Sequence, residues 1–502
     1  MGPPVRLAEI MRAISPHPAG ELSQQDGWGS AASLDLAGVT ADSRQVAPGW
    51  LFAALPGSRA DGRAFIAEAV ARGAAAVLAP EGTAWPAGVP PRPFLQDPEP
   101  RRRLAQMAAA LAGPQPATVV AVTGTNGKTS TVEFLRQIWD GAGQPAASLG
   151  TLGSVAPGFD PGPGLTTPDP VSLAQTLARL KRAGIERAAM EASSHGLDQF
   201  RLDGVRLAAG AMTNLTRDHL DYHGTMAAYR AAKLRLFAEL LPSGAPAVAN
   251  ADMDLDTLDA LREIASRRHL VLGTVGAAGT AIRLLRAEPR PDGQVLTVEH
   301  GTARHEIALP LPGRFQADNA LMAAALAMAL GTPDALDRLS TLVGVRGRME
   351  LAARLASRAA VYVDYAHTPD ALERLLTALR PHTEGRLHVV FGAGGDRDPG
   401  KRPLMGESVG RLADAAIVTD DNPRSEDPAA IRAPILAACR AVLPGVREVG
   451  DRTQAIAEAL AALGPGDVLA VAGKGHEQGQ TVGGTVIPFD DVSVIRRLAG
   501  LA

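Results

Sequence analysis

The chain has one cysteine, no long apolar run and no excess of basic residues, and each deficit excludes a class of protein. Cys439 is the single cysteine among 502 residues, so an internal disulfide framework is impossible and a reducing compartment is expected. No stretch approaches the roughly 18 apolar residues of a membrane span, and the N-terminus lacks the basic-then-apolar pattern of a signal peptide. With 50 Lys and Arg against 53 Asp and Glu, the net charge of −3 gives no electrostatic footprint for nucleic acid. We therefore expect a soluble cytoplasmic protein that binds small molecules, without a nucleic-acid partner or a membrane span.

What the sequence does contain is a phosphate-binding pattern at residues 123–130, Thr-Gly-Thr-Asn-Gly-Lys-Thr-Ser. The apolar, β-branched run 117–122 before it predicts a strand, and a helical pattern follows it. In a strand–turn–helix of this kind, backbone N–H groups and the positive end of the helix dipole attract a phosphate. The expected nucleotide-binding residues are Gly124, Thr125, Asn126, Gly127, Lys128, Thr129 and Ser130.

Two of these side chains have chemistry of their own. Lys128 is expected to neutralise the β- and γ-phosphate oxygens, and the Thr129 hydroxyl to bind Mg²⁺. The usual G-x-x-x-x-G-K-[ST] pattern has a further glycine, at a position where this chain has Val122. A glycine-rich turn without function is the alternative. The correct placement of Gly-Lys-Thr between strand and helix favours a protein that uses ATP or GTP.

The chain divides by texture into three α/β segments. Residues 1–112 hold short apolar runs, and residues 113–116 (Gly-Pro-Gln-Pro) are typical of a linker. From 113 to 345, alternating strands and helices predict a mostly parallel sheet with helices on both faces, and a small antiparallel addition with a Pro-Asp-Gly turn at 291–293. From 346 to 502 the alternation restarts. We expect a smaller N-terminal α/β domain, a central P-loop-type domain and a C-terminal Rossmann-like domain.

Polar clusters follow the predicted strands of the last segment. They begin at Asp364, Gly392, Asp420 and Gly473. Open α/β sheets bind ligands at the carboxyl ends of their strands, so four clusters in one domain indicate a binding site.

A second set of chemistry-bearing residues lies in the central segment. Glu191 in Glu-Ala-Ser-Ser-His and His219 in Asn-Leu-Thr-Arg-Asp-His-Leu-Asp each follow a predicted strand, and both could join Thr129 around Mg²⁺. Lys233 comes next on a predicted helix. An ammonium group cannot bind a cation, but a deprotonated lysine can react with carbon dioxide to give a carbamate that does. The alternative is an exposed helical lysine.

Together these motifs, in this order, resemble the Mur ligase family, which makes the peptide precursor of the bacterial cell wall. The likeness extends from about Asp42 to Glu477, nearly the whole chain. It implies that Lys128, Glu191, His219 and Lys233 are catalytic, and that Lys233 carries the carbamate. It also implies an ATP-driven amide ligation through an acyl phosphate, with ATP and Mg²⁺ required.

Within the family, the resemblance is closest to the MurE branch, which adds the third amino acid to UDP-N-acetylmuramoyl-L-alanyl-D-glutamate. The first domain would bind this UDP-precursor, the central domain ATP and the third domain the amino acid. Residues matching precursor contacts are Ser43, Thr166, Thr167, Ser193 and Arg201. Residues matching adenine or other nucleotide contacts are Asn319, Arg348 and Asp364, although capping or packing would also explain Asn319.

The identity of the added amino acid depends on Asp421-Asn-Pro-Arg424, a form that looks like the meso-diaminopimelate enzymes. Diaminopimelate has a second carboxylate that lysine lacks, and a guanidinium can hold it with two hydrogen bonds. The alternative for Arg424 is a salt bridge with Asp427. The residues expected to bind diaminopimelate are Arg397, Asp421, Asn422, Arg424, Gly473 and Glu477.

The expected protein is a monomer in which the third domain closes over the nucleotide about a hinge at 343–347. A lysine-adding relative, a folylpolyglutamate-type ligase and a P-loop switch or motor are the competing interpretations. Arg424 disfavours the first and the Ser43 and Thr166 matches disfavour the second. The absence of a basic surface disfavours a motor.

Overall fold

The computed structural model describes residues 4–14, 33–57, 60–159, 164–290 and 292–501. The chain forms two compact units: residues 1–274 with 326–332, and residues 275–325 with 333–502. The division falls within strand β13 (Val271–Gly276) and helix α10 (Arg314–Ala329). The boundaries expected at 112/113 and 345/346 stay predictions. Within the described residues, no helix combines the length and apolar character that a membrane span requires.

The first unit begins with a four-stranded parallel sheet in the order β3-β4-β5-β6. Its central strands are continuous apolar runs because both faces of a parallel sheet are buried. The strands are β3 (Gly38–Thr40), β4 (Trp50–Ala53), β5 (Ala76–Pro80) and β6 (Phe94–Asp97), and β1 (Val5–Arg6) pairs separately with β2 (Asp35–Leu36). The helices are α1 (Leu7–Ile14), the 3-10 helices η3 (Ser43–Gln45) and η4 (Gly62–Phe65), α2 (Ile66–Ala71) and α3 (Pro100–Ala112).

Residues 113–116 contain no helix or strand, as expected of the linker, but they are anchored. Buried Gln115 donates to the Gly204 carbonyl at 2.7 Å and accepts from the Arg206 N–H at 3.1 Å.

The larger sheet of the first unit has β7 at its centre, with neighbours in the order β13-β12-β11-β7-β10-β8-β9. All pairings from β12 to β8 are parallel, and β9 runs antiparallel to β8. The strands are β7 (Thr118–Thr123), β8 (Ala146–Gly150), β9 (Gly153–Val155), β10 (Arg187–Glu191), β11 (Ala209–Met212) and β12 (Pro246–Asn250). Because β10 and β11 flank β7 on opposite sides, the loops after these three strands meet at one edge, where ligands of open sheets bind. The predicted strands at 117–122, 187–191 and 209–213 are confirmed.

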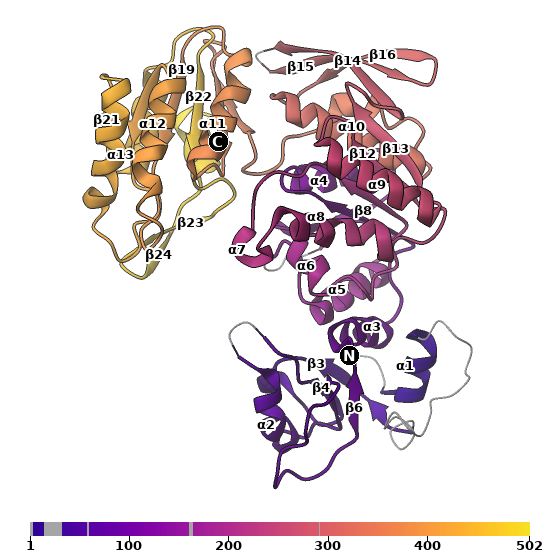
Figure 1. The fold of residues 1–502 in the computed structure, drawn as a ribbon. Coiled ribbons are helices and arrows are strands. Elements are labelled where there is room, and N and C mark those ends of the chain that lie inside the picture. The colour runs from indigo at the N-terminus through magenta and orange to yellow at the C-terminus, as the bar shows by residue number, and fades with distance from the viewer. Residues whose placement is uncertain (1–3, 15–32, 58–59, 160–163, 291, 502) are drawn as a thin grey trace. The chain divides into compact units, whose positions relative to one another are not determined.

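Helices and one π-helix connect these strands (Figure 1). They are α4 (Lys128–Gly141), α5 (Pro170–Arg182), α6 (Ser194–Asp198), α7 (Leu220–His223), α8 (Met226–Arg235), the π-helix η5 (Leu236–Leu240) and α9 (Leu255–Arg268). Apolar side chains of α5, α8 and α9 join β7, β10 and β12 in one core.

The second unit begins with antiparallel strands, followed by α10, as the sequence predicts. The strands are β14 (Ile282–Arg290), β15 (Gly293–His300) and β16 (Ala303–Leu309). Pro291 of the predicted Pro-Asp-Gly turn lies outside the described residues. The buried His382 ring ties this hairpin to the rest of the unit: its Nε2 accepts from the Gly313 N–H and its Nδ1 lies 2.8 Å from the Arg290 carbonyl.

A six-stranded sheet in the order β17-β18-β22-β19-β20-β21 forms the rest of the second unit. Only β17 is antiparallel to its neighbour. The strands are β17 (Glu350–Arg354), β18 (Ala360–Asp364), β19 (Leu387–Phe391), β20 (Ala415–Val418), β21 (Arg447–Glu448) and β22 (Val468–Ala472). The carboxyl ends of β18, β19, β20 and β22 share one edge, so the four predicted polar clusters do follow strands that end there.

Helices cover both faces of this sheet (Figure 1). One face packs against α11 (Pro369–Leu379), α12 (Lys401–Leu412) and α13 (Pro428–Val442), and the other against α14 (Arg452–Ala461) and α15 (Asp491–Leu498). Short 3-10 helices are η6 (Asp337–Thr341) and η7 (Arg380–His382), and a separate hairpin is formed by β23 (Gly479–Val482) and β24 (Thr485–Pro488). The predicted hinge residues 343–347 lie between η6 and β17 and form neither helix nor strand, and their role as a hinge stays a prediction.

Candidate active site

The loop between β7 and α4 is shaped by two glycines with positive φ. Gly124 has φ +142° and Gly127, the residue before α4, has φ +85°. A Cβ on Gly124 would overlap the Thr213 hydroxyl at the end of β11. The loop therefore lies directly against the neighbouring strand, and only glycine fits at its first turn.

Residues after β11 brace this loop from the side. The Thr125 N–H donates to the Asn214 carbonyl at 3.0 Å, and the Asn126 N–H donates to the Asn214 side-chain oxygen at 3.0 Å. Thr213 Oγ1 donates to the Asn126 carbonyl at 2.6 Å. These bonds fix the loop in the conformation that begins α4, with the N-terminal N–H groups of that helix available to an anion.

The Lys128 ammonium folds back over the loop. Its Nζ donates to the carbonyls of Gly124 at 3.0 Å and Thr125 at 2.9 Å. The Thr125 hydroxyl in turn lies 3.1 Å from the hydroxyl of Tyr229 on α8. Ser130 is buried in the first turn of α4.

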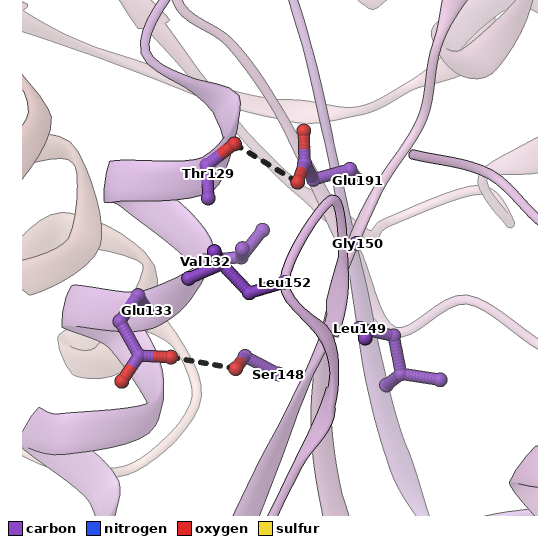
Figure 2. Close-up of a pocket in the computed structure, with 9 residues that line it drawn as sticks. Thr129, Val132, Glu133, Ser148, Leu149, Gly150, Leu152 and Glu191 are labelled. Carbon is purple, nitrogen blue, oxygen red and sulfur yellow. Dashed lines mark hydrogen bonds between the residues drawn. The ribbon is translucent and has the colours of Figure 1, made fainter. Parts of the chain in front are cut away.

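Thr129 and Glu191 form a direct pair between α4 and the end of β10 (Figure 2). Thr129 Oγ1 donates to Glu191 Oε1 at 2.9 Å, and the Thr151 N–H donates to the same oxygen at 2.8 Å. The Glu191 side chain is held against Gly150, where an added Cβ would overlap its carboxylate. Figure 2 also shows the neighbouring Ser148–Glu133 hydrogen bond, and the space between the two pairs is only about 10 Å³.

A larger cavity of about 260 Å³ brings two groups of predicted residues together. One group is catalytic and the other matches precursor contacts. Its lining includes Lys128, His219 and Lys233 of the first group and Thr166, Thr167, Ser193 and Arg201 of the second, together with Leu165, Ser194, His195 and Tyr229.

Lys233 lies at the inner wall of this cavity. Its side chain is 1% exposed, so the interpretation as an exposed helical lysine is wrong. Its Nζ donates to the Gly124 carbonyl at 2.7 Å and lies 4.5 Å from the centre of the Tyr229 ring. Burial, with a smaller effect of the Lys128 charge, lowers the pKa of the Lys233 amine to about 6. The amine is therefore neutral at pH 7 unless a partner anion is bound.

The precursor-matching residues form a connected polar network. Thr167 Oγ1 donates to the Glu191 carbonyl at 3.0 Å and accepts from the Ser193 N–H at 3.0 Å. Arg201 Nη1 donates to the Thr167 carbonyl at 2.6 Å, and the Thr166 hydroxyl contacts that of Thr151 at 3.1 Å. The Ser193 hydroxyl caps α6, where it accepts from a backbone N–H.

His219 belongs to a group of rings, with His195 and Tyr229, that line the cavity. It has φ +51° and its ring centre lies 4.9 Å from that of His195 and 6.1 Å from that of Tyr229. Burial lowers the pKa of His195. In the part of the chain that the structure describes, no three His, Cys, Asp or Glu side chains converge to hold a metal by themselves.

Ser43 lies outside this cavity lining. Its hydroxyl, in η3, donates to Glu68 Oε2 at 3.1 Å. Its predicted contact with the uridine part of the precursor stays a prediction.

The remaining nucleotide-matching residues are in the second unit. Asp364 accepts from the backbone N–H groups of Met349 and Ala366, both at 2.8 Å, and burial raises the pKa of its carboxyl. The Arg348 guanidinium lies 5.2 Å from the centre of the Tyr365 ring. Asn319 is buried in α10 and donates to Gln316 Oε1 at 3.2 Å. Since the phosphate loop belongs to the first unit, a joint contact of these residues with one nucleotide stays a prediction.

The residues expected to bind diaminopimelate gather at the carboxyl edge of the second unit's sheet. Asn422 Nδ2 donates to Glu477 Oε2 at 2.8 Å and to Asp421 Oδ1 at 3.3 Å. Gly473 has φ +122° and a Cβ there would be 3.0 Å from Asp421 Oδ2. Arg424 Nη1 donates to the Gly395 carbonyl at 2.6 Å, and in the described residues it makes no ion pair with Asp427. Arg397 is exposed in the loop between β19 and α12, at the same edge of the sheet.

Sequence reasoning missed several residues that contact this machinery. Tyr229 precedes Lys233 by one helical turn, a spacing that could have indicated it. Gln199 accepts from Arg201 and donates to the Tyr222 hydroxyl, and nothing in the sequence signals this. Asn214 braces the loop, and Lys474 is buried among the diaminopimelate residues.

Comparison with known proteins places these sites in a family. The Mur ligase middle domain matches residues 122–327, the "Mur ligase, glutamate ligase domain" 347–475, and the "Mur ligase family, catalytic domain" 35–112. The UDP-N-acetylmuramoyl-L-alanyl-D-glutamate–2,6-diaminopimelate ligase of Caulobacter vibrioides is 56% identical, covering 91% of this chain and 94% of the relative. That of Rhizobium meliloti is 53% identical, covering 94% of this chain and 96% of its own.

The chain is also similar to solved structures of ligases. A ligase of the same name superimposes with a TM-score of 0.74 at 32% identity, covering 99% of both chains. MurF ligase from Thermotoga maritima, solved in complex with ADP, gives 0.59 at 19% identity over 92% of this chain and 97% of its own, which supports the fold alone. On these matches over nearly its whole length, the chain belongs to the Mur ligase family.

Proposed function

We propose that this protein is an ATP-dependent, ADP-forming ligase of peptidoglycan precursor synthesis. It adds meso-diaminopimelate to the D-glutamate of UDP-N-acetylmuramoyl-L-alanyl-D-glutamate. Relatives that are more than half identical to this chain are named UDP-N-acetylmuramoyl-L-alanyl-D-glutamate–2,6-diaminopimelate ligases. The observation that carries the proposal is the 2.7 Å contact between Lys233 Nζ and the Gly124 carbonyl, because it joins the phosphate loop to the cavity of the precursor-matching residues.

The reaction has two steps. The D-glutamate γ-carboxylate attacks the γ-phosphorus of ATP, and ADP leaves as the acyl phosphate forms. The diaminopimelate amine then attacks the acyl carbonyl, and phosphate leaves from the tetrahedral intermediate. Such a transfer needs positioning and neutralisation of charge on the transferring oxygens. Lys128 and the loop N–H groups supply both on the nucleotide side, while Arg201 and Ser193 hold the precursor.

The residues present fit Mg²⁺, which prefers oxygen ligands and keeps several waters or phosphate oxygens. Thr129 and Glu191 offer two oxygens 2.9 Å apart between the loop and β10. A second ion would be held by His219 and the carbamate of Lys233, which line one cavity. Mg²⁺ in these places would offset the charge of the transferring phosphoryl group.

The environment of Lys233 favours the carbamate. Only a neutral amine attacks carbon dioxide, and a pKa of about 6 leaves this amine neutral at pH 7. The product is an anionic N-carboxylate with release of one proton. The Lys128 ammonium, whose effect on the Lys233 pKa is that of a nearby positive charge, would stabilise the anion.

Specificity for diaminopimelate comes from the second unit. Arg424 would hold the carboxylate that lysine lacks, with Arg397 helping to position the amino acid, and Glu477 with Asp421 would accept the far ammonium. Closure of the amino-acid domain about 343–347 would exclude water from the acyl phosphate. The protein would act in the cytoplasm as a monomer.

An amino-acid panel tests this function. Purified protein is given Mg-ATP and the UDP-precursor, and phosphate release is recorded with meso-diaminopimelate, lysine or no amino acid. Strict dependence on both the precursor and diaminopimelate is expected. Preference for lysine would make the specificity assignment wrong, and phosphate release that ignores both substrates would favour a nucleotide switch.

Arg424→Ala sharpens the panel. Losing a charge-assisted contact is worth roughly 1.5–3 kcal/mol, so kcat/KM for diaminopimelate should fall about 10- to 100-fold, with little change for lysine. An equal fall for both amino acids would remove Arg424 from carboxylate recognition.

A further inference from the structure

The hairpin β23–β24 is attached to the loop that carries the predicted specificity residues, 420–424. Arg424 forms a parallel bridge with Val482. The Arg424 N–H donates to the Thr481 carbonyl at 2.9 Å, and the Gly483 N–H donates to the Arg424 carbonyl at 2.7 Å. Gln480 Nε2 donates to the Asp421 carbonyl at 2.8 Å. Every residue from 480 to 483 therefore takes part in holding this loop.

The loop needs such support because its key arginine is in an unfavourable conformation. Arg424 has φ +54°, in the left-handed region that non-glycine residues rarely adopt. Residues persist there only where their surroundings determine the backbone, and such positions cluster at functional sites. The two hairpin bonds to Arg424 N and O hold the backbone on both sides of this residue.

Lys474 connects the hairpin to the side chain of Asn422. Its side chain is 0% exposed, and its Nζ donates to Asn422 Oδ1 at 3.0 Å and to the Gly479 carbonyl at 2.9 Å. It also forms an ion pair with Asp421 Oδ1 at 3.5 Å. Burying an ammonium group costs free energy unless it is paired and hydrogen-bonded, so Lys474 can be buried only with these three partners in place.

Asn422 is fully oriented as a result. Its side-chain oxygen accepts from Lys474 and from the Thr481 N–H at 2.9 Å, and its amide nitrogen donates to Glu477 and Asp421. These four bonds use the hydrogen-bonding capacity of the amide and allow one orientation only. Glu477 and Asp421 are thereby aimed by the amide.

Core packing does not explain the hairpin. Its apolar side chains Val482, Val486 and Ile487 are 39%, 66% and 48% exposed, so none of them is a buried core residue. Polar contacts tie it to the specificity loop and to Lys474.

We propose that Lys474 and the β23–β24 hairpin are positioning elements for amino-acid selection. They hold the Asn422 amide, the Glu477 carboxylate and the left-handed Arg424 in one arrangement, which matches an amino acid whose far end carries both an ammonium and a carboxylate. This inference rests on the proposed function. It assigns selection to residues that do not themselves touch the amino acid.

Two variants and a matched control test the proposal in the full chain. Lys474→Met removes the buried ammonium at similar length, and Gln480→Ala removes one partly exposed side-chain bond to the loop. His388→Gln is the control, because His388 is also buried in a polar pair, with Asp467, but at the amino end of the same sheet. For each folded protein, KM and kcat are measured for diaminopimelate, lysine, ATP and the UDP-precursor, together with the melting temperature.

For Lys474→Met, KM for diaminopimelate is expected to rise about tenfold or more, because a charged hydrogen bond is lost. For Gln480→Ala a rise of about threefold is expected. In both variants KM for ATP stays unchanged and the preference for diaminopimelate over lysine falls. The control His388→Gln alters the melting temperature without altering that preference. If Lys474→Met does not fold, Gln480→Ala decides.

An unchanged preference in the folded variants, or the same change in the control, overturns the inference. A wild-type protein that does not use diaminopimelate overturns the proposed function instead. The two failures are thus distinguishable.

Discussion

Replacement of Lys233 by alanine is the sharpest test of the proposed chemistry. The side chain is buried, its Nζ contacts the Gly124 carbonyl, and it lines the cavity that also contains Lys128 and His219. The substitution removes the only atom that can carry the carbamate. The phosphate loop loses its bond from Lys233 but keeps those from Lys128, Thr213 and Asn214. ATP binding should therefore persist while turnover collapses.

The size of the loss follows from the role. Removing one preorganised electrostatic contact from a transferring group costs on the order of 10²–10³ in rate, which corresponds to about 3–4 kcal/mol of barrier. Alanine also empties the space of three methylenes and an amine beside a cavity of about 260 Å³. A short carboxylate such as acetate or formate can enter that space and place an anion where the carbamate stood, so partial rescue is expected.

Phosphate release with saturating precursor, diaminopimelate and Mg-ATP measures both effects, across a series of carboxylates of increasing length. Lys181→Ala is the control, since Lys181 lies on α5 and pairs with Glu186 at the surface. Full activity of Lys233→Ala without an additive would refute the carbamate. Rescue by chloride as effective as rescue by acetate would refute the requirement for a carboxylate.

Two further predictions concern the backbone and the response to pH. Gly150→Ala should lower turnover roughly 10- to 100-fold, because its Cβ would displace the Glu191 carboxylate. The control Gly445→Ala should retain activity in the same assay, because its Cβ would meet nothing within 4 Å. Burial lowers the pKa of His382. Below about pH 6.5 the unfolded chain therefore binds a proton at this ring more readily than the folded chain does. The free energy of unfolding should fall as the pH drops. In His382→Gln the side chain can still accept from the Gly313 N–H but cannot titrate. Denaturant unfolding between pH 5 and 7.5 should therefore show a smaller change of the free energy of unfolding with pH. The same pH dependence as in the wild type would exclude His382 as its cause.

The sequence predicted the site where its signals are local. The run 117–122 and the loop after it are adjacent in the chain, so the strand, turn and helix could be placed from a single pattern. The polar clusters after β18, β19, β20 and β22 were predictable for the same reason, because parallel strands with helices between them bring their carboxyl ends to one edge.

Tertiary contacts were beyond such reasoning. Asn214 braces the phosphate loop from 88 residues away, and the hairpin holds Arg424 through backbone atoms that have no sequence signature. The left-handed φ of His219 and Arg424 is also unreadable, since glycine and asparagine are the residues that favour it. The burial of Lys233 is contrary to the usual expectation for a helical lysine, and the family resemblance predicted a carbamate there but not the burial.

The departure of the phosphate loop from the usual pattern has a structural explanation. Val122 is a strand residue: it is 0% exposed and pairs with Glu191 on β10 and Ala211 on β11. An apolar side chain there adds to the core of the sheet, whereas a glycine would leave that space unfilled. The conformational demands fall instead on Gly124 and Gly127, which have positive φ, with no room for a Cβ on Gly124. Two glycines at the turn and at the start of α4 are therefore sufficient for the cradle, and a Val122→Gly change toward the usual pattern should destabilise β7 without improving nucleotide binding.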